Sequence, residues 1–578
     1  MMIFPRTFCT SFLLTVVMLF GSTSGLAQTS NTDSPAAAQS QVGQGQAAQL
    51  EGQLEIVYQD FKDHSRLSYS LKQSDGTRVP LQFTKQPPTH LLTGDHVQVS
   101  GQRSGSGLIL YSGSTNIKKT GGGGSSSCTA DSGQTCSTAS SIPVPNTFGA
   151  QSTLIILVNF QDDVVEPYTV ADAQNAYFGT ANNFSMENSY GQTSLTGTVV
   201  GWYTIPDSVT TCNTSQIATD AQSAATANGV NLSNYTRYVY LFPQDDACGF
   251  GGASTVGGNP SQNWLNGTLD PHTVNHELGH GLGLWHSHSL DCGTTATICS
   301  SGTIQEYGDQ VDVMGSVQGA SPDYNAFQKE RLGWLNYGAS PSIQTVTASG
   351  TYTITPYENG PGPNALKVFQ STNSTTGAKT WYYLESRQAI GFDAFLTTWP
   401  YGTTENETTG VLLHLGTDGD GNSSLMLNMT PAASNFFDFE MSLAVGQSFN
   451  DPTAGVTFTT QSVTSAGATV SVQLSNSPNP SPQTVGTLTV ATNQANYSPG
   501  QTVSVTATAT NAGSPVANVS VSFAITNPNG SNVKASATTG NNGQAVYKLK
   551  LKQTAPAGTY VAGAAATAVS ASTDFTVQ

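Results

Sequence analysis

The stretch His276-Glu-Leu-Gly-His280-Gly-Leu-Gly-Leu-Trp-His286 decides how this chain is interpreted, because it fits the pattern H-E-x-x-H-x-x-G-x-x-H. Its first two histidines are four residues apart, so on a helix they share one face and can reach the same ion. Gly283 tolerates a positive φ and can end that helix in a turn, which brings His286 round as a third ligand. We therefore predict a metal centre formed by His276, His280 and His286.

The expected metal is a single zinc ion. Three neutral imidazoles leave zinc its full charge and an open position for water, which is typical of catalytic rather than structural sites. Glu277 follows the first ligand and is predicted to act as the general base, taking a proton from that water and passing it to a leaving amine. The alternative outside enzymes is a cell-surface adhesin or binding protein with a structural or idle metal site. Such a site has no use for the carboxylate of Glu277.

A second element follows about one loop downstream, in the segment Tyr307-Gly-Asp-Gln-Val-Asp-Val-Met314-Gly315. In proteins that carry the extended histidine motif, a turn containing methionine forms the floor beneath the metal. Met314 is predicted to be that methionine.

With these elements in order, residues 153–335 resemble the gametolysin family of metzincin peptidases. The similarity also rests on the segments Val158-Asn-Phe-Gln-Asp162, Ser189-Tyr-Gly191, Gly201-Trp-Tyr203 and Gln328-Lys-Glu-Arg-Leu-Gly-Trp334. It implies an α/β metzincin-type catalytic domain and a zinc-dependent endopeptidase that acts on extracellular proteins. Astacins and serralysins place a tyrosine two residues after the methionine, whereas this chain has Ser316, so the group that stabilises the oxyanion is left unidentified.

The N-terminus has the features of an export signal. Arg6 provides a positive charge, residues 12–20 are apolar, and Ala27 is a small residue suited to cleavage. We expect residues 1–27 to be removed and the protein to be secreted. No run reaches the ~20 apolar residues that a membrane span needs. The net charge of −17 with only 10% charged residues argues against nucleic-acid binding.

The cysteines support the same compartment. Without the one in the signal, six of the seven remain, and an even number in an exported chain suggests disulfide bonds. Close spacing favours the pairs Cys128 with Cys136 and Cys292 with Cys299, which leaves Cys212 with Cys248.

The pattern upstream of the motif predicts a separate module. Five short alternating runs, at residues 54–58, 67–71, 79–83, 97–100 and 108–111, are typical of a small β-barrel. We assign residues 28–118 to this barrel and residues 119–142 to a Gly/Ser-rich linker. Because the linker is a plausible processing site, the barrel is predicted to be a pro-region that is cleaved off; the alternative is a permanent accessory domain.

The chain as a whole is predicted to be multidomain, with all-β domains flanking the catalytic one. The apolar run at residues 154–158 is typical of a buried central strand and opens a metallopeptidase domain at residues 143–337. Residues 338–476 alternate as in a β-sandwich, residues 477–486 form a Pro-rich linker, and residues 487–578 form an immunoglobulin-like domain. We expect a monomer whose last module serves spacing or attachment.

Several other residues are interpreted as ordinary. His288 is expected to be an exposed loop histidine and His414 a core histidine. The segment Asp418-Gly-Asp-Gly-Asn422 begins like a calcium loop, but Ser423 replaces the required glycine and Met429 the closing glutamate, so Ca²⁺ stays an unproven second cofactor. The sequence does not identify the substrate.

Overall fold

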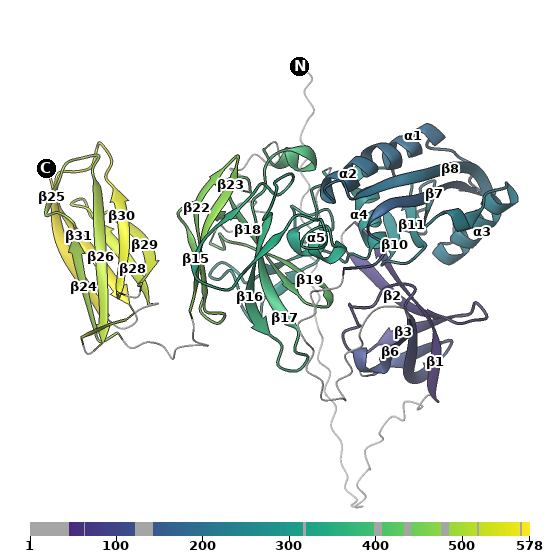
Figure 1. The fold of residues 1–578 in the computed structure, drawn as a ribbon, viewed down its shortest axis with the longest axis horizontal. Helices are drawn as coiled ribbons and strands as arrows, with labels where there is room; N and C mark the ends of the chain where they lie inside the picture. Colours follow the sequence, from purple (N-terminus) through teal and green to yellow (C-terminus); the bar gives the residue numbers. More distant parts are fainter. Residues whose placement is uncertain are drawn as a thin grey trace, which may run out of the picture.

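The computed structural model describes residues 46–578 apart from positions 63, 112, 122–142, 316–319, 398–406, 433–440, 476–484, 512, 517–518, 541 and 567–568 (Figure 1). The predicted signal, Cys128, Cys136, Ser316 and most of both predicted linkers lie outside the described residues. Strands predominate in the described part, and its α-helices all lie between residues 170 and 332.

The N-terminal part is a small barrel. Its strands are β1 (Ala47–Asp60), β2 (Ser65–Lys72), β3 (Arg78–Phe83), β4 (His96–Ser104), β5 (Gly107–Leu110) and β6 (Ile117–Gly121), with a short 3₁₀ turn, η1 (Gly113–Asn116), before the last. Five of them close the ring β1-β2-β3-β5-β4-β1. Alternate residues of β1 point inward, and Leu54, Ile56 and Tyr58 are at most 3% exposed. The period-2 pattern therefore predicted these strands because one face of each is buried.

A mixed sheet flanked by helices follows. Its elements are β7 (Gly149–Phe160), α1 (Val170–Gln174), η2 (Asn175–Ala181), α2 (Asn182–Asn188), β8 (Thr193–Ile205), α3 (Thr214–Ala227), η3 (Leu232–Asn234), β9 (Arg237–Phe242), β10 (Gly252–Thr255), β11 (Ser261–Asn266) and α4 (Pro271–Leu282). The strand order is β10-β11-β9-β7-β8. All neighbours are parallel except β10, which is antiparallel to β11.

Helices cover both faces of the mixed sheet. Ile155 and Leu157 of β7 pack with residues of α1, α2 and α4 on one face. Leu154 and Ile156 pack with residues of α3 on the other. A strand buried on both faces needs a continuous apolar run rather than an alternating one, which explains the sequence at residues 154–158.

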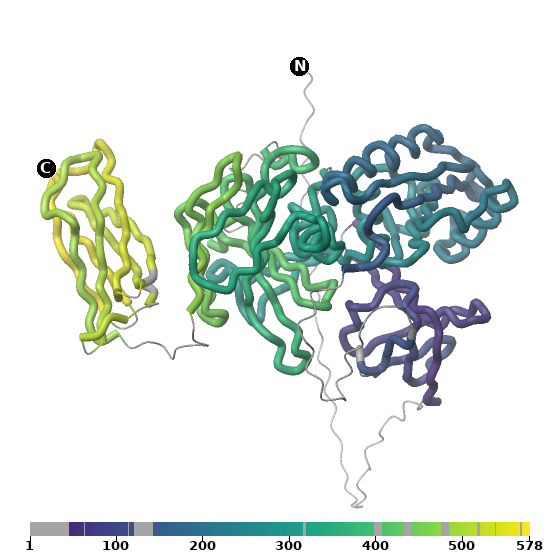
Figure 2. The backbone as a smooth tube through the Cα atoms, viewed as in Figure 1, coloured from purple at the N-terminus to yellow at the C-terminus, as the bar shows by residue number. Residues whose placement is uncertain are grey.

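The barrel and the mixed sheet are joined edge to edge. Strand β1 pairs antiparallel with β10, with Val57 opposite Thr255 and Asp60 opposite Gly252. The result is one 11-stranded sheet in the order β6-β4-β5-β3-β2-β1-β10-β11-β9-β7-β8. Figure 2 shows the purple barrel directly against the teal part of the chain. The edge strand β10 is therefore covered by a segment that lies about 200 residues earlier in the sequence.

The next part is built on two further sheets. Its elements are β12 (His288–Asp291), β13 (Thr303–Gln305), α5 (Ala326–Leu332), β14 (Ile343–Val346), β15 (Gly350–Ile354), β16 (Ala365–Thr372), β17 (Lys379–Glu385), η4 (Gly391–Thr397), β18 (Gly410–Thr417), β19 (Asp420–Leu427), β20 (Leu443–Ala444), β21 (Ser448–Asp451), β22 (Val456–Thr464) and β23 (Gly467–Leu474). One sheet has the order β13-β12-β19-β18-β17-β16-β14, with β20 paired to β18, and the other has the order β15-β23-β22-β21.

The first of these sheets draws strands from both sides of the boundary placed at residue 337. Strand β12 runs parallel to β19, with His288 opposite Leu425. Ala326 and Phe327 of α5 pack with Tyr383 of β17. The boundary stays a prediction, but the two segments it separates share one sheet and one core.

The C-terminal part consists of two sheets around a core of their own. Its strands are β24 (Thr487–Thr492), β25 (Asn496–Tyr497), β26 (Thr502–Asn511), β27 (Ser514–Pro515), β28 (Ser520–Thr526), β29 (Asn532–Thr538), β30 (Gln544–Lys550), β31 (Gly558–Ala566) and β32 (Val569–Val577). Strands β24, β26, β27 and β30 form one sheet, and the other has the order β25-β32-β31-β28-β29. Val503 and Val505 of β26 pack with Phe523 of β28 between the sheets.

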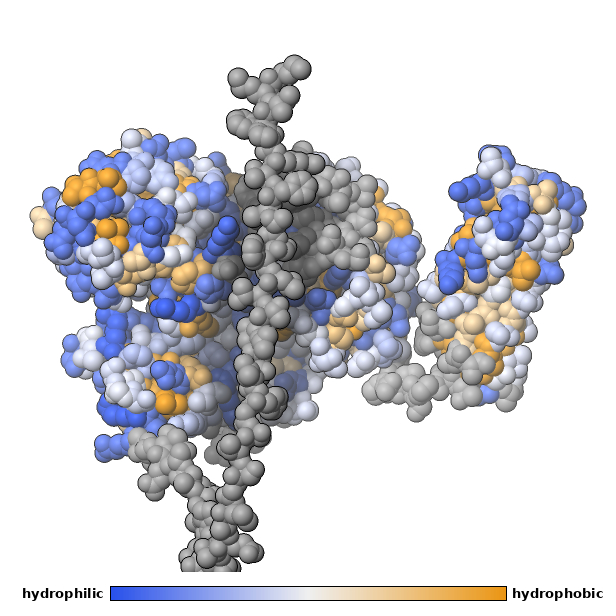
Figure 3. Space-filling view, turned by 180° about the vertical axis from the view of Figure 1, so that it is seen from behind, coloured by the Kyte–Doolittle hydropathy of each residue, from blue (hydrophilic) through white to orange (hydrophobic). Residues whose placement is uncertain are grey.

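Two disulfide bonds lie in the described part, Cys212–Cys248 and Cys292–Cys299. Close spacing predicted the pair Cys292–Cys299, and elimination predicted the pair Cys212–Cys248. No helix among the described residues is long and apolar enough to cross a membrane. On the face shown in Figure 3, hydrophobic residues form small groups among hydrophilic ones.

Candidate metal centre

Helix α4 presents the first two histidines of the motif. It begins after Asp270, whose side chain accepts a backbone hydrogen bond in the first turn, it has Pro271 in that turn, and it ends at Gly283 with φ 105°. Aspartate satisfies a free N–H, proline suits the first turn, and glycine adopts the left-handed conformation without steric cost. His276 and His280 therefore lie one turn apart on the same face, and both are buried.

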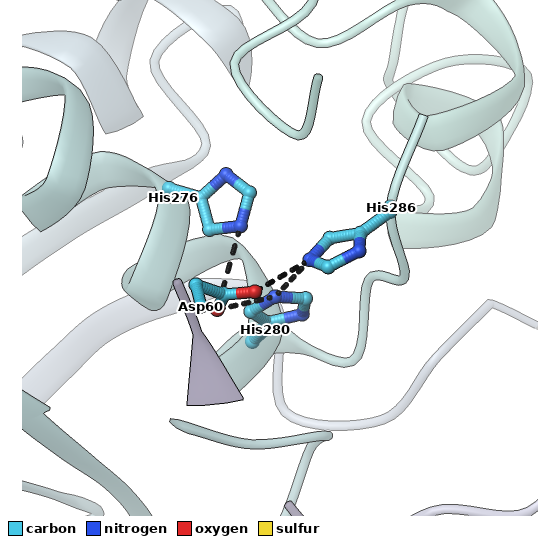
Figure 4. Close-up of side chains that lie close together, drawn as sticks. All are labelled: Asp60, His276, His280 and His286. Atoms are coloured by element: carbon cyan, nitrogen blue, oxygen red, sulfur yellow. Dashed lines mark hydrogen bonds and ion pairs between the residues drawn. The ribbon is translucent and has the colours of Figure 1, made fainter. Parts of the chain in front are cut away.

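The turn at Gly283 brings His286 to the same point. One ligand atom each from His276, His280, His286 and Asp60 lies within 4.8 Å of the other three (Figure 4). Within the described residues, this is the group of three or more His, Cys, Asp or Glu side chains found at such separations. The structure thus brings together the three histidines that the sequence predicted as ligands, and adds an aspartate.

The second nitrogen of each imidazole is held by a protein oxygen. The contacts are His276 Nδ1 to Val313 O at 2.7 Å, His280 Nδ1 to Leu284 O at 2.9 Å and His286 Nδ1 to Glu306 Oε1 at 2.5 Å. Carbonyl and carboxylate oxygens accept, so Nδ1 carries the proton and each Nε2 presents a lone pair. The Nε2 atoms of His280 and His286 are 3.1 Å apart, where two lone pairs repel unless a cation lies between them. The donor set therefore fits a metal ion.

Asp60 was not predicted from the sequence. It is the last residue of β1, and its carboxylate enters the histidine group from the barrel side (Figure 4). Oδ1 lies 3.0 Å from His286 Nε2, and Oδ2 lies 3.4 Å from His280 Nε2 and 3.7 Å from His276 Nε2. No spacing rule links Asp60 to the motif, because the contact depends on the pairing of β1 with β10. The local signal was slight, because Asp60 lies two residues beyond the predicted run at residues 54–58.

Glu277 lies beneath the covered edge of the sheet. It is fully buried, and neither carboxylate oxygen has a hydrogen-bond partner among the described residues. Burial, with a further contribution from the charge of Asp60, raises the pKa of Glu277 well above its usual range. A Cβ at Gly252 would overlap the Glu277 carboxylate, so glycine at this position of β10 leaves the carboxylate its space.

A cavity of about 380 Å³ adjoins these groups. Its lining includes Asp60, Phe61, Gly252, His276, Glu277 and Tyr307. This volume falls in the range of ligand-binding clefts, and several polar groups line it. The general-base candidate and the first metal ligand therefore face the same space.

The methionine turn lies directly beneath helix α4. Met314 is fully buried, and its backbone N–H donates to Asp312 Oδ1 at 2.7 Å. Its carbonyl accepts from Ser287 N at 2.9 Å, next to the third histidine. A Cβ at Gly279 would come closer to Met314 Sδ than real Cβ contacts allow. The turn thus packs against helix α4 beside the histidines. Its role as the floor beneath a metal stays a prediction.

This contact yields a stability prediction. Gly279→Ala is expected to lower the free energy of unfolding by about 1–3 kcal/mol, because the added methyl group must displace packed atoms. Thermal unfolding followed by circular dichroism measures the change. Gly350→Ala is the matched control, since a Cβ there meets only ordinary contacts with Tyr352. Equal melting temperatures for both variants would contradict the close packing of helix and turn.

Glu306 and Tyr307, which precede Met314 in the sequence, also belong to the site. The sequence analysis gave neither residue a role. Glu306 accepts from His286 Nδ1 and from Ser65 Oγ at 2.9 Å, so it orients the imidazole of His286. Tyr307 adopts a left-handed conformation with φ 55°, and its hydroxyl donates to Asp60 Oδ1 at 2.7 Å. Its ring lies 4.3 Å from that of His286. The tyrosine hydroxyl therefore faces the metal-binding group.

The other residues singled out in the sequence, His288, His414 and the segment considered for calcium, are not part of the group formed by Asp60 and the three histidines. His288 is not an exposed loop histidine, because it lies in β12, is only 2% exposed and contacts Asn422 Oδ1 at 3.0 Å. His414 is buried as predicted, 2.9 Å from Asp309 Oδ2. In the segment considered for calcium, Asp420 Oδ1 accepts from Thr89 Oγ1 of the barrel at 2.6 Å. The carboxylate of Asp420 thus takes part in the contact between the barrel and strand β19.

Comparison with known proteins identifies two segments. Residues 158–400 match the sequence model of the gametolysin peptidase M11 family, and residues 487–577 match the model of the MG2 domain. The first match supports a metallopeptidase in general, and a metallopeptidase family implies protein substrates and a metal. The second covers the C-terminal sheets. No curated protein matches the chain.

Two solved structures are similar to parts of this chain. Trypsin-activated alpha-2-macroglobulin from Escherichia coli is 14% identical over 35% of this chain and 12% of its own, with a TM-score of 0.15. An adhesin of Yersinia pseudotuberculosis is 14% identical over 37% of this chain and 59% of its own, with a TM-score of 0.14. This chain spans less than two thirds of either structure.

Proposed function

We propose that this chain is a secreted, zinc-dependent metalloendopeptidase of the metzincin type that cleaves extracellular proteins. The observation that carries the proposal is the convergence of three imidazoles, each with its Nδ1 held by an oxygen, beside the buried carboxylate of Glu277 and an adjoining cavity. A structural metal site would need neither the cavity nor the carboxylate of Glu277. The two disulfide bonds support an extracellular location.

The chain's own residues divide the chemistry between them. A bound zinc ion supplies a water of lowered pKa and polarises the carbonyl of the substrate. His276, His280 and His286 would hold it. Glu277 would accept the proton of the attacking water and deliver it to the leaving amine.

We assign the oxyanion-stabilising role to Tyr307. Its hydroxyl donates at 2.7 Å to Asp60 Oδ1, an oxygen that lies 3.0 Å from the Nε2 of His286. A substrate oxygen that takes the place of this carboxylate oxygen would receive the same hydrogen bond. A donor already oriented toward the developing charge stabilises the transition state without reorganising. This geometry supports Tyr307 as the group that the sequence left unidentified.

The modules around the site have proposed roles. The barrel is a pro-region or an accessory domain, and the C-terminal sheets serve spacing or attachment. Residues before and after position 337 share one sheet, so we propose that they act as one unit with the metal centre. A monomer is sufficient, because one chain supplies every group named above.

The metal is tested by its removal. Purified protein is expected to contain one zinc per chain, and the form that cleaves casein is expected to lose that activity with a chelator and regain it with zinc. His280→Ala should lose the zinc, measured by plasma mass spectrometry. His96→Ala is the control, since His96 is half exposed on β4, outside the metal-binding group. Full zinc occupancy in His280→Ala would refute the ligand assignment. A zinc protein without peptidase activity would favour the adhesin alternative.

A further inference from the structure

We propose that Asp60 is a fourth metal ligand and that β1, which carries it, occupies the edge of the sheet where an extended peptide substrate would pair. The full-length chain is then latent, and the hairpin formed by β1 and β2 is its internal inhibitor. This inference rests on the proposed peptidase function and names the regulation of the same site.

The first argument is the chemical environment of the Asp60 carboxylate. Asp60 Oδ2 is buried and has no hydrogen-bond partner among the described residues, and the same is true of His276 Nε2. A buried carboxylate oxygen without a partner is unfavourable, because it has lost the hydrogen bonds of water and gained none in exchange. The imidazole nitrogens that face it present lone pairs rather than protons, because their Nδ1 atoms donate elsewhere. A cation between the carboxylate and the imidazoles satisfies all of these atoms at once.

The second argument is the backbone pairing of β1. Val57 to Asp60 lie opposite Thr255 to Gly252. Val256 N donates to Ile56 O at 2.9 Å, and Gly251 N donates to Asp60 O at 2.9 Å. An unpaired sheet edge is a ready template for an extended peptide. With β1 in place, a peptide reaching the cleft along β10 finds these backbone groups already paired.

The third argument is that side chains on both strands of the hairpin contact the histidine group or the carboxylate beside it. The ring of Tyr58 lies 4.7 Å from that of His280, stacked at 17°, and 4.3 Å from that of His286. Ser65 Oγ donates to Glu306 Oε1, the carboxylate that orients His286. These contacts hold both sides of the hairpin tip, so the carboxylate is positioned rather than merely nearby.

The barrel also contacts the rest of the protein away from the hairpin, and these contacts help to hold the hairpin in place. Trp285, next to the third histidine, is fully buried among the apolar residues of the barrel core. Thr89 O accepts from Gly421 N at 3.2 Å, and Thr89 Oγ1 donates to Asp420. Release of the site therefore requires the barrel to separate from the mixed sheet and from β19, not only a side-chain rotation of Asp60.

Asp60→Ala and Asp60→Asn in the full-length chain test the proposal. The asparagine variant keeps the shape and guards against misfolding; Asp75→Ala, at the exposed turn between β2 and β3, is the matched control. The first readout is the visible spectrum of the Co²⁺-substituted protein in a Glu277→Ala background, which prevents self-cleavage. Loss of a carboxylate ligand is expected to change the spectrum in both Asp60 variants and not in the control.

The second readout uses chains with Glu277 intact, shown by mass spectrometry to be uncut. If the bond from Asp60 to the metal stabilises the closed state about 10-fold and less than ~1% of the wild-type chain is open, Asp60→Ala should raise cleavage of a short fluorogenic peptide by about 10-fold, although the barrel stays paired in most chains. An unchanged Co²⁺ spectrum together with unchanged peptide cleavage would overturn the proposal that Asp60 binds the metal and that the hairpin inhibits the site. Wild-type protein that binds neither zinc nor Co²⁺ would instead overturn the proposed function, so the two failures are distinguishable.

Discussion

Glu277→Ala is expected to lower kcat by about 10²–10⁴-fold, the usual contribution of a positioned general base, while the chain keeps its fold and one zinc ion. Glu277 contributes no atom to the metal-binding group, so removing its carboxylate should leave the metal in place. Its two oxygens have no other partner among the described residues, so no hydrogen bond of the fold is lost either. The measurement is steady-state cleavage of a fluorogenic peptide by the activated form, with zinc analysis of the same sample.

Two further variants sharpen this test. Glu277→Gln keeps the shape but cannot accept a proton, so it should lose as much activity as the alanine variant. Glu166→Ala removes an exposed carboxylate and should leave kcat unchanged. A Glu277 variant with near-normal turnover would exclude the general-base role. A variant that has lost its zinc would instead point to a structural contribution.

Tyr307→Phe is expected to lower kcat by about 10²–10³-fold with little change in KM, the loss seen when one oxyanion donor is removed. Phenylalanine keeps the ring that lies against His286 and removes only the hydroxyl. A hydrogen bond made mainly in the transition state affects kcat, whereas one made equally to bound substrate would appear in KM. The activated form is measured over a full range of peptide concentrations.

The control for this variant is Tyr337→Phe. Tyr337 is half exposed and stacks on Phe148, outside the cleft. Its hydroxyl should be dispensable for both kcat and KM. A Tyr307→Phe enzyme with normal kcat would contradict the assignment, and an increase in KM alone would make Tyr307 a substrate-binding residue.

The sequence predicted the parts of the site that depend on local geometry. The spacing of His276 and His280 is a property of one helix, and the position of His286 follows from the turn at Gly283 three residues earlier. Met314 could be found because it follows the motif in a recognisable order. In each case, the residues that decide the geometry lie close together in the sequence.

The rest depends on pairing between distant segments, which periodicity does not reveal. Nothing near Asp60 indicates that β1 will pair with β10, because alternation fixes which face of a strand is buried but not its neighbour. The short strand β12 was likewise not predicted, since a segment of four residues is too short to show a hydrophobic period. The domain boundary at residue 337 follows the change of pattern along the chain, while the sheet that contains β12 and β19 crosses it.

The pairing of β12 with β19 has a consequence for how the protein is made. Strand β12 begins two residues after His286, and its partner β19 ends at Leu427, so the third ligand gains its full support only when that strand has emerged. Translation of the roughly 300 residues between the end of β6 and the end of β19 takes on the order of 15–60 s at ~5–20 residues per second. Small β-domains fold within ms to s. The barrel can therefore fold before the last strand that supports the centre has been made, so we expect the centre to assemble with β1 already available to cover it.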